Sequence, residues 1–168
     1  MQELLKNYGA ALAGARVLDF GSGTGLLTEH LVAAGATVHA VDTSPAMIEV
    51  LDAKIAEQRW TKVTTSAERP ATTPQYDLIV CSSVCSFLDD YPATVTALVA
   101  LIQPAGLFVQ WDWEREDGDT HGLSKAEINS ALTDAGLIGV SVNAGFSISI
   151  DDQTLSPLMG YGQRPHNG

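Results

Sequence analysis

Basic residues are scarce in this sequence. Nine lysines and arginines stand against twenty aspartates and glutamates, so the 168 residues carry a formal net charge of −11. Proteins that hold nucleic-acid phosphates or an anionic membrane surface without sequence specificity concentrate positive charge in a patch, and no such cluster occurs here. The charge balance therefore argues against nucleic acid and membrane as partners and favours small or cationic ones.

Cysteines and long apolar runs are also lacking. The two cysteines, Cys81 and Cys85, are too few for a disulfide framework. They have no nearby histidine or further cysteine to complete a zinc site, so we expect small buried side chains and no metal. No segment approaches the roughly 18 apolar residues of a membrane span, and the N-terminus lacks the basic region and apolar core of a signal peptide. These features predict a cytoplasmic protein.

The length and the 45% apolar content fit one globular domain over residues 1–168. Apolar residues at helical spacing predict a lead-in helix within 1–14, and residues 15–163 form the expected core. Residues 164–168 are expected to be a frayed tail.

A glycine-rich segment follows the first apolar run. Residues 16–20 read as a strand, the sequence Gly21-Ser22-Gly23-Thr24-Gly25 as a tight turn, and Leu26-Leu27 as the start of a helix. Glycines allow positive φ and close approach of a ligand, and a helix N-terminus offers unpaired N–H groups. A nucleoside triphosphate loop would need a lysine where Leu26 stands, and a dinucleotide fingerprint would read G-x-G-x-x-G. The segment is predicted to bind a ligand of another kind.

Strand and helix patterns alternate along the rest of the chain. Strands are predicted at 16–20, 37–41, 62–65, 76–81, 107–112, 140–150 and 158–162, with the turn 103–106 before the fifth and the turn 151–153 between the last two. Helices are predicted at 24–34, 45–58, 92–102 and 124–135. The helix over 45–58 starts with a cap residue and a proline, and Ser124-x-x-Glu127 is a capping box. Such alternation predicts a parallel sheet with right-handed crossovers.

With Asp19 two residues before Gly21, the glycine segment reads D-x-G-x-G-x-G and resembles the first motif of class I S-adenosylmethionine-dependent methyltransferases. Four later blocks are similar to further parts of that family in the same order: VHAVDTSPAMIEV (38–50), YDLIVCSSVCSFLDD (76–90), LIQPAGLFVQWDWE (101–114) and HGLSKAEINSALTDAGL (121–137). The resemblance covers the chain from Val17 onward. It implies a Rossmann-like, doubly wound α/β sheet of about seven strands, mostly parallel, with one antiparallel strand near the C-terminal edge.

Two departures from the family pattern bear on the acceptor. Only about 14 residues precede the first strand, whereas family members usually carry a longer segment or a lid there. The Asn-Pro-Pro-Tyr type motif of base or glutamine methylation is absent after the fourth predicted strand, where Cys81-Ser82-Ser83-Val84 stands. A small-molecule acceptor is therefore preferred over nucleic acid.

The resemblance implies S-adenosylmethionine as cofactor and S-adenosylhomocysteine as product. Asp19 would receive the methionine ammonium beside the loop residues Gly21, Ser22, Gly23 and Gly25. Asp42, followed by Thr43, ends the second strand, where a carboxylate can accept both ribose hydroxyls. The remaining predicted cofactor residues are Met47 on the adenine face, Ala67 and Glu68 near the adenine amino group, and Cys81 and Ser82 at the end of the fourth strand. Met47 could instead belong to the core, and Glu68 could be a solvated charge.

Aromatic residues are candidates for the acceptor side. By strand alternation Trp111 and Trp113 lie on one side of the fifth strand and Asp112 on the other. The two indoles could form a wall for a flat acceptor or could be core packing. The other candidates are Phe87, Tyr91 and Tyr8.

Methyl transfer needs alignment above all, and a general base only where the acceptor arrives protonated. His121 and Asp112 are the candidate bases, although His121 could be an ordinary loop histidine. His30 and His39 are expected to be structural.

The sequence thus predicts S-adenosylmethionine-dependent methyl transfer to oxygen or nitrogen of a small, flat or aromatic acceptor by a monomer or homodimer. A module that binds the cofactor but is inactive alone or needs a partner is the first alternative. A nicotinamide-dependent oxidoreductase is the second.

Overall fold

The computed structural model describes residues 11–70, 73, 75–115, 122–145, 148–150, 153–155 and 157–166. Its strands are β1 (Arg16–Phe20), β2 (Thr37–Val41), β3 (Val63–Ser66), β4 (Tyr76–Ser82), β5 (Ile102–Asp112), β6 (Ile138–Ala144), β7 (Ile148–Ile150), β8 (Gln153–Leu155) and β9 (Leu158–Gln163). Its helices are α2 (Leu26–Ala33), α3 (Pro45–Gln58), the 3-10 helix η1 (Cys85–Phe87), α4 (Tyr91–Val99) and α5 (Lys125–Asp134). The ranges predicted for β1, β2 and α3 agree with these bounds.

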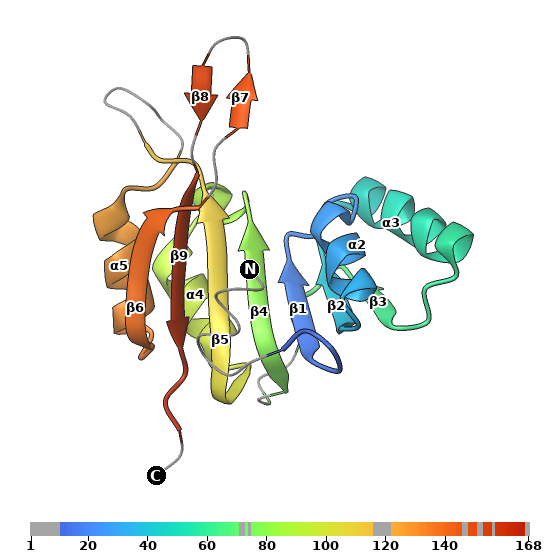
Figure 1. Ribbon diagram of the computed structural model, residues 1–168, viewed down its shortest axis with the longest axis horizontal. Helices are drawn as coiled ribbons and strands as arrows, with labels where there is room; N and C mark the ends of the chain where they lie inside the picture. Colours follow the sequence, from blue (N-terminus) through green and yellow to red (C-terminus); the bar gives the residue numbers. More distant parts are fainter. Residues whose placement is uncertain are drawn as a thin grey trace.

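Seven strands form one central sheet in the order β3-β2-β1-β4-β5-β9-β6 (Figure 1). The strands from β3 to β5 pair in parallel. In this sheet β9 lies between β5 and β6 and is antiparallel to both. The predicted fold class is confirmed. The parallel strands end at one edge of the sheet, as Figure 1 shows, and ligands of open α/β sheets bind outside that edge.

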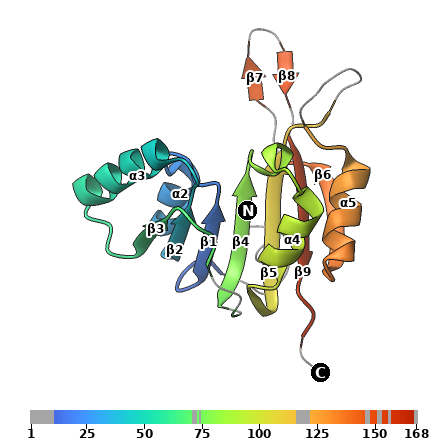
Figure 2. The same ribbon diagram turned by 180° about the vertical axis from the view of Figure 1, so that it is seen from behind.

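The prediction of a single strand over residues 140–150 is wrong. β6 ends at Ala144, and β7 pairs with β8 as a separate hairpin that projects beyond the sheet (Figures 1 and 2). The last pair of the β6–β9 ladder is Ala144 with Leu158, and the next contact is the Gly145 N–H donating to the Pro157 carbonyl at 2.8 Å. Proline has no N–H to return, so the ladder stops there.

Other predicted boundaries shift by smaller amounts. The turn predicted at 103–106 lies inside β5, where Ala105 has a φ of 64° and the pairing with β4 changes register. Residues 11–14 hold no helix, and the rest of the predicted lead-in helix lies outside the described residues. Arg164, the first residue of the predicted tail, donates to the Ala100 carbonyl at 3.0 Å. The capping box of α5 is confirmed, because Glu127 N–H donates to Ser124 Oγ and Ser124 N–H to Glu127 Oε2.

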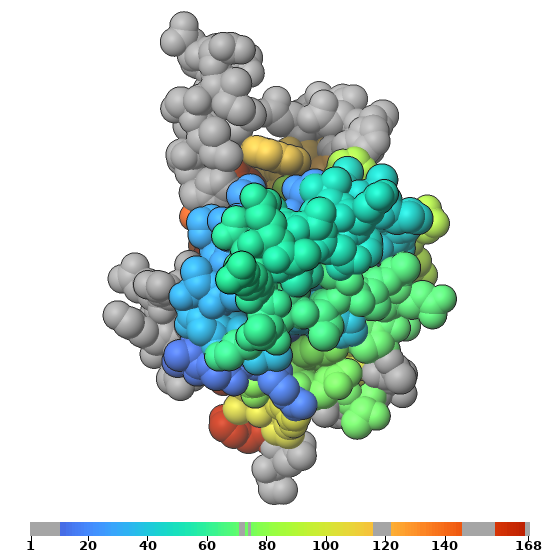
Figure 3. Space-filling view, turned by 90° about the vertical axis from the view of Figure 1, so that its right-hand side faces the viewer, coloured from blue at the N-terminus to red at the C-terminus, as the bar shows by residue number. Residues whose placement is uncertain are grey.

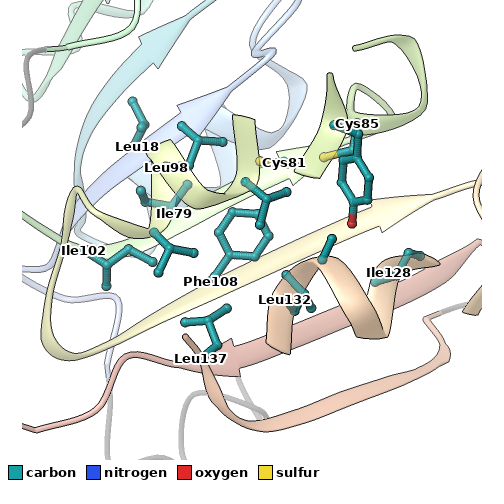
Figure 4. Packing of buried hydrophobic residues seen from close by; sticks show 14 of the residues in the cluster. Leu18, Ile79, Cys81, Cys85, Leu98, Ile102, Phe108, Ile128, Leu132 and Leu137 are labelled. Atoms are coloured by element: carbon teal, nitrogen blue, oxygen red, sulfur yellow. The ribbon is translucent and has the colours of Figure 1, made fainter. Parts of the chain in front are cut away.

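Helices cover both faces of the sheet. α4 and α5 lie on one face and α2 on the other, as the two opposite views show (Figures 1 and 2). Residues alternate between the faces along each strand, so Leu18 of β1 joins the cluster under α4 and α5, and Val17 joins the cluster under α2. Figure 4 shows the first cluster, where Phe108 of β5 lies among Ile79, Leu98 and Leu132.

Helix α3 covers the end of the molecule nearest β3 (teal in Figure 3). Its contact with the glycine segment depends on Gly25, which has a φ of 81° and directly precedes α2. A Cβ at Gly25 would lie 2.4 Å from Leu51 Cδ1, and Leu51 is fully buried. Gly25 therefore lets the start of α2 pack closely against α3.

Replacing Gly25 by alanine is expected to lower the free energy of unfolding by about 2–3 kcal/mol, because left-handed backbone strain adds to overpacking. Denaturant unfolding measures this loss. Gly14→Ala is the matched control, since Gly14 has a φ of 82° and a Cβ there meets nothing within 4 Å. Equal losses in the two variants would show that backbone strain, and not contact with Leu51, is responsible.

Candidate active site

A cavity of about 1130 Å³ opens at the edge where the parallel strands end. Four parts of the chain line it: the glycine segment with α2, the β2–α3 connection, the segment from the end of β4 to η1 together with β5, and the β6–β9 edge. The described lining residues are Asp19, Gly21, Ser22, Gly23, Thr24, Leu26, Leu27, His30, Asp42, Ser44, Met47, Ser82, Ser83, Val84, Phe87, Trp111, Asn143, Gly145, Met159 and Tyr161.

The glycine segment turns sharply between two neighbouring strands. Gly21 N–H and Ser22 N–H both donate to the Val41 carbonyl at the end of β2, at 2.8 and 3.0 Å. Gly21 has a φ of 74°, and a Cβ there would lie 2.5 Å from Val84. Gly23 has a φ of 52°, and a Cβ there would meet nothing within 4 Å. Gly21 thus packs against the chain after β4, and Gly23 leaves open space on the cavity side.

Asp42 joins the glycine segment to the start of α3. Its Oδ2 accepts a hydrogen bond from Gly23 N–H at 2.8 Å, and its Oδ1 accepts one from Ser44 N–H at 2.9 Å. An ionised carboxylate has about four acceptor sites. Two remain after these contacts, so Asp42 can accept a pair of ligand hydroxyls at the cavity wall.

Asp19 is a buried carboxyl at the base of the cavity. It is 1% exposed, and its Oδ2 accepts a hydrogen bond from Thr28 Oγ1 at 2.6 Å. Burial raises the pKa of Asp19 from 3.8 to about 6, and the contact with Thr28 limits the rise. A cationic group placed beside Asp19 would lower this pKa again, so the site favours a cation.

Ser22 places a buried hydroxyl on the cavity. The residue is 8% exposed, and its Oγ has no hydrogen-bond partner among the described residues. Buried polar atoms are nearly always paired with protein, water or ligand. The Ser22 hydroxyl is therefore available to a bound polar group.

Apolar side chains also line the cavity. Leu27 comes from α2, Trp111 from β5, and Met159 and Tyr161 from β9. His30 of α2 and Asn143 of β6 add two polar side chains. No lysine or arginine is among the described lining residues. These side chains suit a flat ligand without negative charge.

Nine of the predicted site residues lie on this cavity: Asp19, Gly21, Ser22, Gly23, Asp42, Met47, Ser82, Phe87 and Trp111. Met47 is 41% exposed and Phe87 65% exposed, so both present apolar surface at the opening. His121 and Tyr8 lie outside the described residues.

Five predicted cofactor residues are not among the described lining residues. Gly25 packs on Leu51 instead, and Thr43, Ala67 and Glu68 are exposed. Cys81 is fully buried on the α4 face. Strand alternation explains why Cys81 faces away from the cavity, because its neighbour Ser82 faces the cavity.

Three predicted acceptor or catalytic residues also lie elsewhere. Trp113 is 37% exposed beyond the end of β5. Tyr91 begins α4 and is buried on the other face of the sheet. Asp112 is fully buried, and burial raises its pKa to about 6. A side chain that faces away from Trp111 cannot touch an acceptor bound against that indole.

Sequence reasoning missed the walls from α2 and β9. His30 was expected to be structural and lies on the cavity, whereas His39 bonds Tyr76 and Ser66. A signal for β9 exists in Leu-Met-Gly-Tyr-Gly-Gln, where large and small residues alternate. A Cβ at Gly160 would lie 2.4 Å from Ile128 of α5, so Gly160 admits α5, and its neighbours Met159 and Tyr161 line the cavity.

Within the described part of the chain, none of the helices combines the length and the apolar character needed to span a bilayer. The same residues contain no group of three histidine, cysteine or acidic side chains that could hold a metal ion.

A family model described as a methyltransferase domain matches residues 18–108, more than half of the chain. The protein therefore belongs to the methyltransferase domain family, and the predicted methyltransferase family is confirmed. The ubiquinone biosynthesis O-methyltransferase of Aromatoleum aromaticum is 36% identical over 101 residues, which are 58% of this chain and 43% of that protein. The enzyme of the same name from Xylella fastidiosa is 39% identical over 106 residues, 58% of this chain and 42% of that protein. The chain spans less than half the length of these relatives.

Solved methyltransferase structures share the fold at low identity. Magnesium protoporphyrin IX methyltransferase from Synechocystis, with bound S-adenosylmethionine, has a TM-score of 0.72 and 23% identity, covering 96% of this chain and 75% of that one. An N-methyltransferase from Haemonchus contortus in complex with S-adenosylhomocysteine has a TM-score of 0.79 and 15% identity, covering 98% and 52%. At this identity the likeness shows the fold alone.

Proposed function

We propose that this protein transfers the methyl group of S-adenosylmethionine to an oxygen or nitrogen atom of a small, flat, uncharged acceptor. The observation that carries the proposal is the shared cavity. Asp42 and the glycine segment line one part, and the apolar wall around Trp111 lines another. Cofactor and acceptor can thus meet inside one enclosure, as methyl transfer requires.

The residues present fit the cofactor. Its ammonium group needs an anionic partner, which Asp19 provides. Its ribose diol fits the free acceptor sites of Asp42, and the unpaired Ser22 hydroxyl can bond the amino-acid end. When bound, S-adenosylmethionine supplies an already activated methyl group on a cationic sulfur. The task of the protein is then to align the acceptor, and positioning alone can supply up to about 7–11 kcal/mol of barrier reduction.

The lining charges indicate the acceptor class. An anionic acceptor would need a lysine or arginine, and the described lining has neither. The acids Asp19 and Asp42 are assigned to the cofactor, which leaves no carboxylate among the described lining residues for a cationic amine. An uncharged ring against Trp111 fits, with His30 and Asn143 available to its polar groups. His30 is the candidate group to accept a proton from an acceptor hydroxyl, because an imidazole nitrogen can serve as a general base.

Methyl-labelled S-adenosylmethionine tests the proposal when it is offered with catechol, 3,4-dihydroxybenzoate or ethanolamine. We expect label transfer to catechol at least tenfold faster than to 3,4-dihydroxybenzoate, whose ring is the same but carries a carboxylate, and no transfer to ethanolamine. Asp42→Ala should abolish transfer. Binding of S-adenosylhomocysteine without any transfer would instead support a cofactor-binding module that is inactive alone. The nicotinamide alternative has no support, since the chain belongs to the methyltransferase family.

A further inference from the structure

A buried polar network lies on the face of the sheet opposite the cavity. Asp112 and Gln110 of β5 are both fully buried, and Tyr91 of α4 is 7% exposed. Tyr91 O–H donates to Gln110 Oε1 at 2.8 Å, and Gln110 Nε2 donates to Asp112 Oδ2 at 3.2 Å. Asp112 Oδ1 in turn accepts from Ser86 N–H at 3.1 Å. The network therefore ties β5 to both α4 and η1.

Asp112 contacts η1, and residues at both ends of this helix line the cavity. Ser86 is the middle residue of η1, Phe87 follows it, and Val84 immediately precedes the helix. Val84 and Phe87 line the cavity, and Val84 also packs against Gly21. A shift of η1 would move this wall, whereas Asp42 is held separately by Gly23 N–H and Ser44 N–H.

Burial disfavours a charge in this network. Burial raises the pKa of Asp112 and of Tyr91, which shows that the fold disfavours the ionised forms of both groups. Apolar side chains of similar volume at such positions are often neutral or stabilising. A direct contact between Asp112 and the backbone of a cavity wall gives the carboxyl a use other than stability.

We propose that Asp112 is a positioning residue that fixes η1 through the Ser86 N–H, so that Val84 and Phe87 hold the acceptor against the methyl group. This inference rests on the proposed methyl transfer. It replaces the catalytic role predicted for Asp112, because the carboxyl acts through the backbone and does not touch the cavity.

Asp112→Ala and Asp112→Asn test the inference, because asparagine keeps an oxygen that can accept from Ser86 N–H. Amide hydrogen exchange of residues 84–88, measured with saturating S-adenosylhomocysteine, should be at least tenfold faster in the alanine variant. The Asp112→Asn variant should keep most of the wild-type protection against exchange. The dissociation constant of S-adenosylhomocysteine should stay within threefold in both. Tyr76→Phe is the control, since it removes a part-buried hydrogen bond with His39 away from the cavity.

Steady-state kinetics with catechol adds a readout that a purely structural role would not move. We expect KM for catechol to rise about tenfold in Asp112→Ala, with a smaller change in kcat. Both constants of Asp112→Asn should stay close to those of the wild type. Unchanged exchange in the alanine variant would overturn the inference, and so would loss of S-adenosylhomocysteine binding in both variants. If the Asp112→Ala variant does not fold, the Asp112→Asn variant decides. Accelerated exchange or a raised KM for catechol in Asp112→Asn supports the inference, and wild-type values overturn it. A wild-type protein that methylates nothing would contradict the proposed function, while the exchange experiment would still decide whether Asp112 fixes η1.

Discussion

Replacing Asp42 by asparagine is expected to weaken S-adenosylhomocysteine binding about 100-fold, or about 2.7 kcal/mol. The carboxylate accepts from both Gly23 N–H and Ser44 N–H. An amide has only one oxygen, so its NH₂ group would face one of these donors. The change thus disturbs the loop and removes the negative acceptor for the ribose hydroxyls, and hydrogen bonds to charged groups contribute about 1.5–3 kcal/mol each.

Calorimetric titration with S-adenosylhomocysteine measures this effect. Asp52→Asn is the matched control, because Asp52 lies on α3 and accepts from Thr65 Oγ1 at 2.7 Å without lining the cavity. The control should bind within twofold of wild type. Equal affinity of the Asp42 and Asp52 variants would show that Asp42 does not hold the cofactor, and the assignment of the whole site would fail with it.

Lowering the pH from 7.5 to 5 is expected to weaken S-adenosylhomocysteine binding about tenfold. The pKa of Asp19 is raised to about 6 in the free protein, so below pH 6 a growing fraction carries a proton. A protonated Asp19 cannot pair with the ligand ammonium, which stays charged over this range. Affinity then falls by up to tenfold for each further pH unit.

Calorimetry at several pH values, in two buffers of different ionisation enthalpy, measures both the affinity and the protons released on binding. The Asp19→Asn variant should bind weakly at every pH and show no such dependence. Asp112 has a similarly raised pKa but does not line the cavity, so Asp112→Asn should retain the wild-type pH profile. Constant wild-type affinity from pH 7.5 to 5 would remove Asp19 from the ammonium site.

The same carboxyl has the opposite effect on the stability of the ligand-free protein. Its pKa rises from 3.8 unfolded to about 6 folded, so the folded state binds more protons between these values. The contribution of Asp19 to stability is therefore full below pH 3.8 and is lost as the pH rises through 6. At 1.36 kcal/mol for each pH unit, the loss is about 3 kcal/mol. Asp19→Asn should accordingly be more stable than wild type at pH 7.5, where denaturant unfolding can compare them.

Prediction from sequence succeeded where local chemistry decides. The glycine spacing of residues 21–25 requires a turn, the Ser44-Pro45 pair starts α3, and Ser124 with Glu127 caps α5. Asp19 and Asp42 end neighbouring strands, so a parallel sheet must bring them to one edge. Each of these features can be predicted from residues that are close together in the sequence.

Prediction failed where distant segments meet. The sequence alone established a methyltransferase-like alternation of strands and helices, a turn able to hold a ligand, and the two acids beside it. Only the tertiary structure decided that Asp112 faces α4 and Trp111 the cavity, that His30 is a wall residue, and that β7 and β8 leave the sheet. The reason is physical: period-two alternation separates the two sides of a strand but does not say which side is covered, because that depends on helices and strands far away in the sequence.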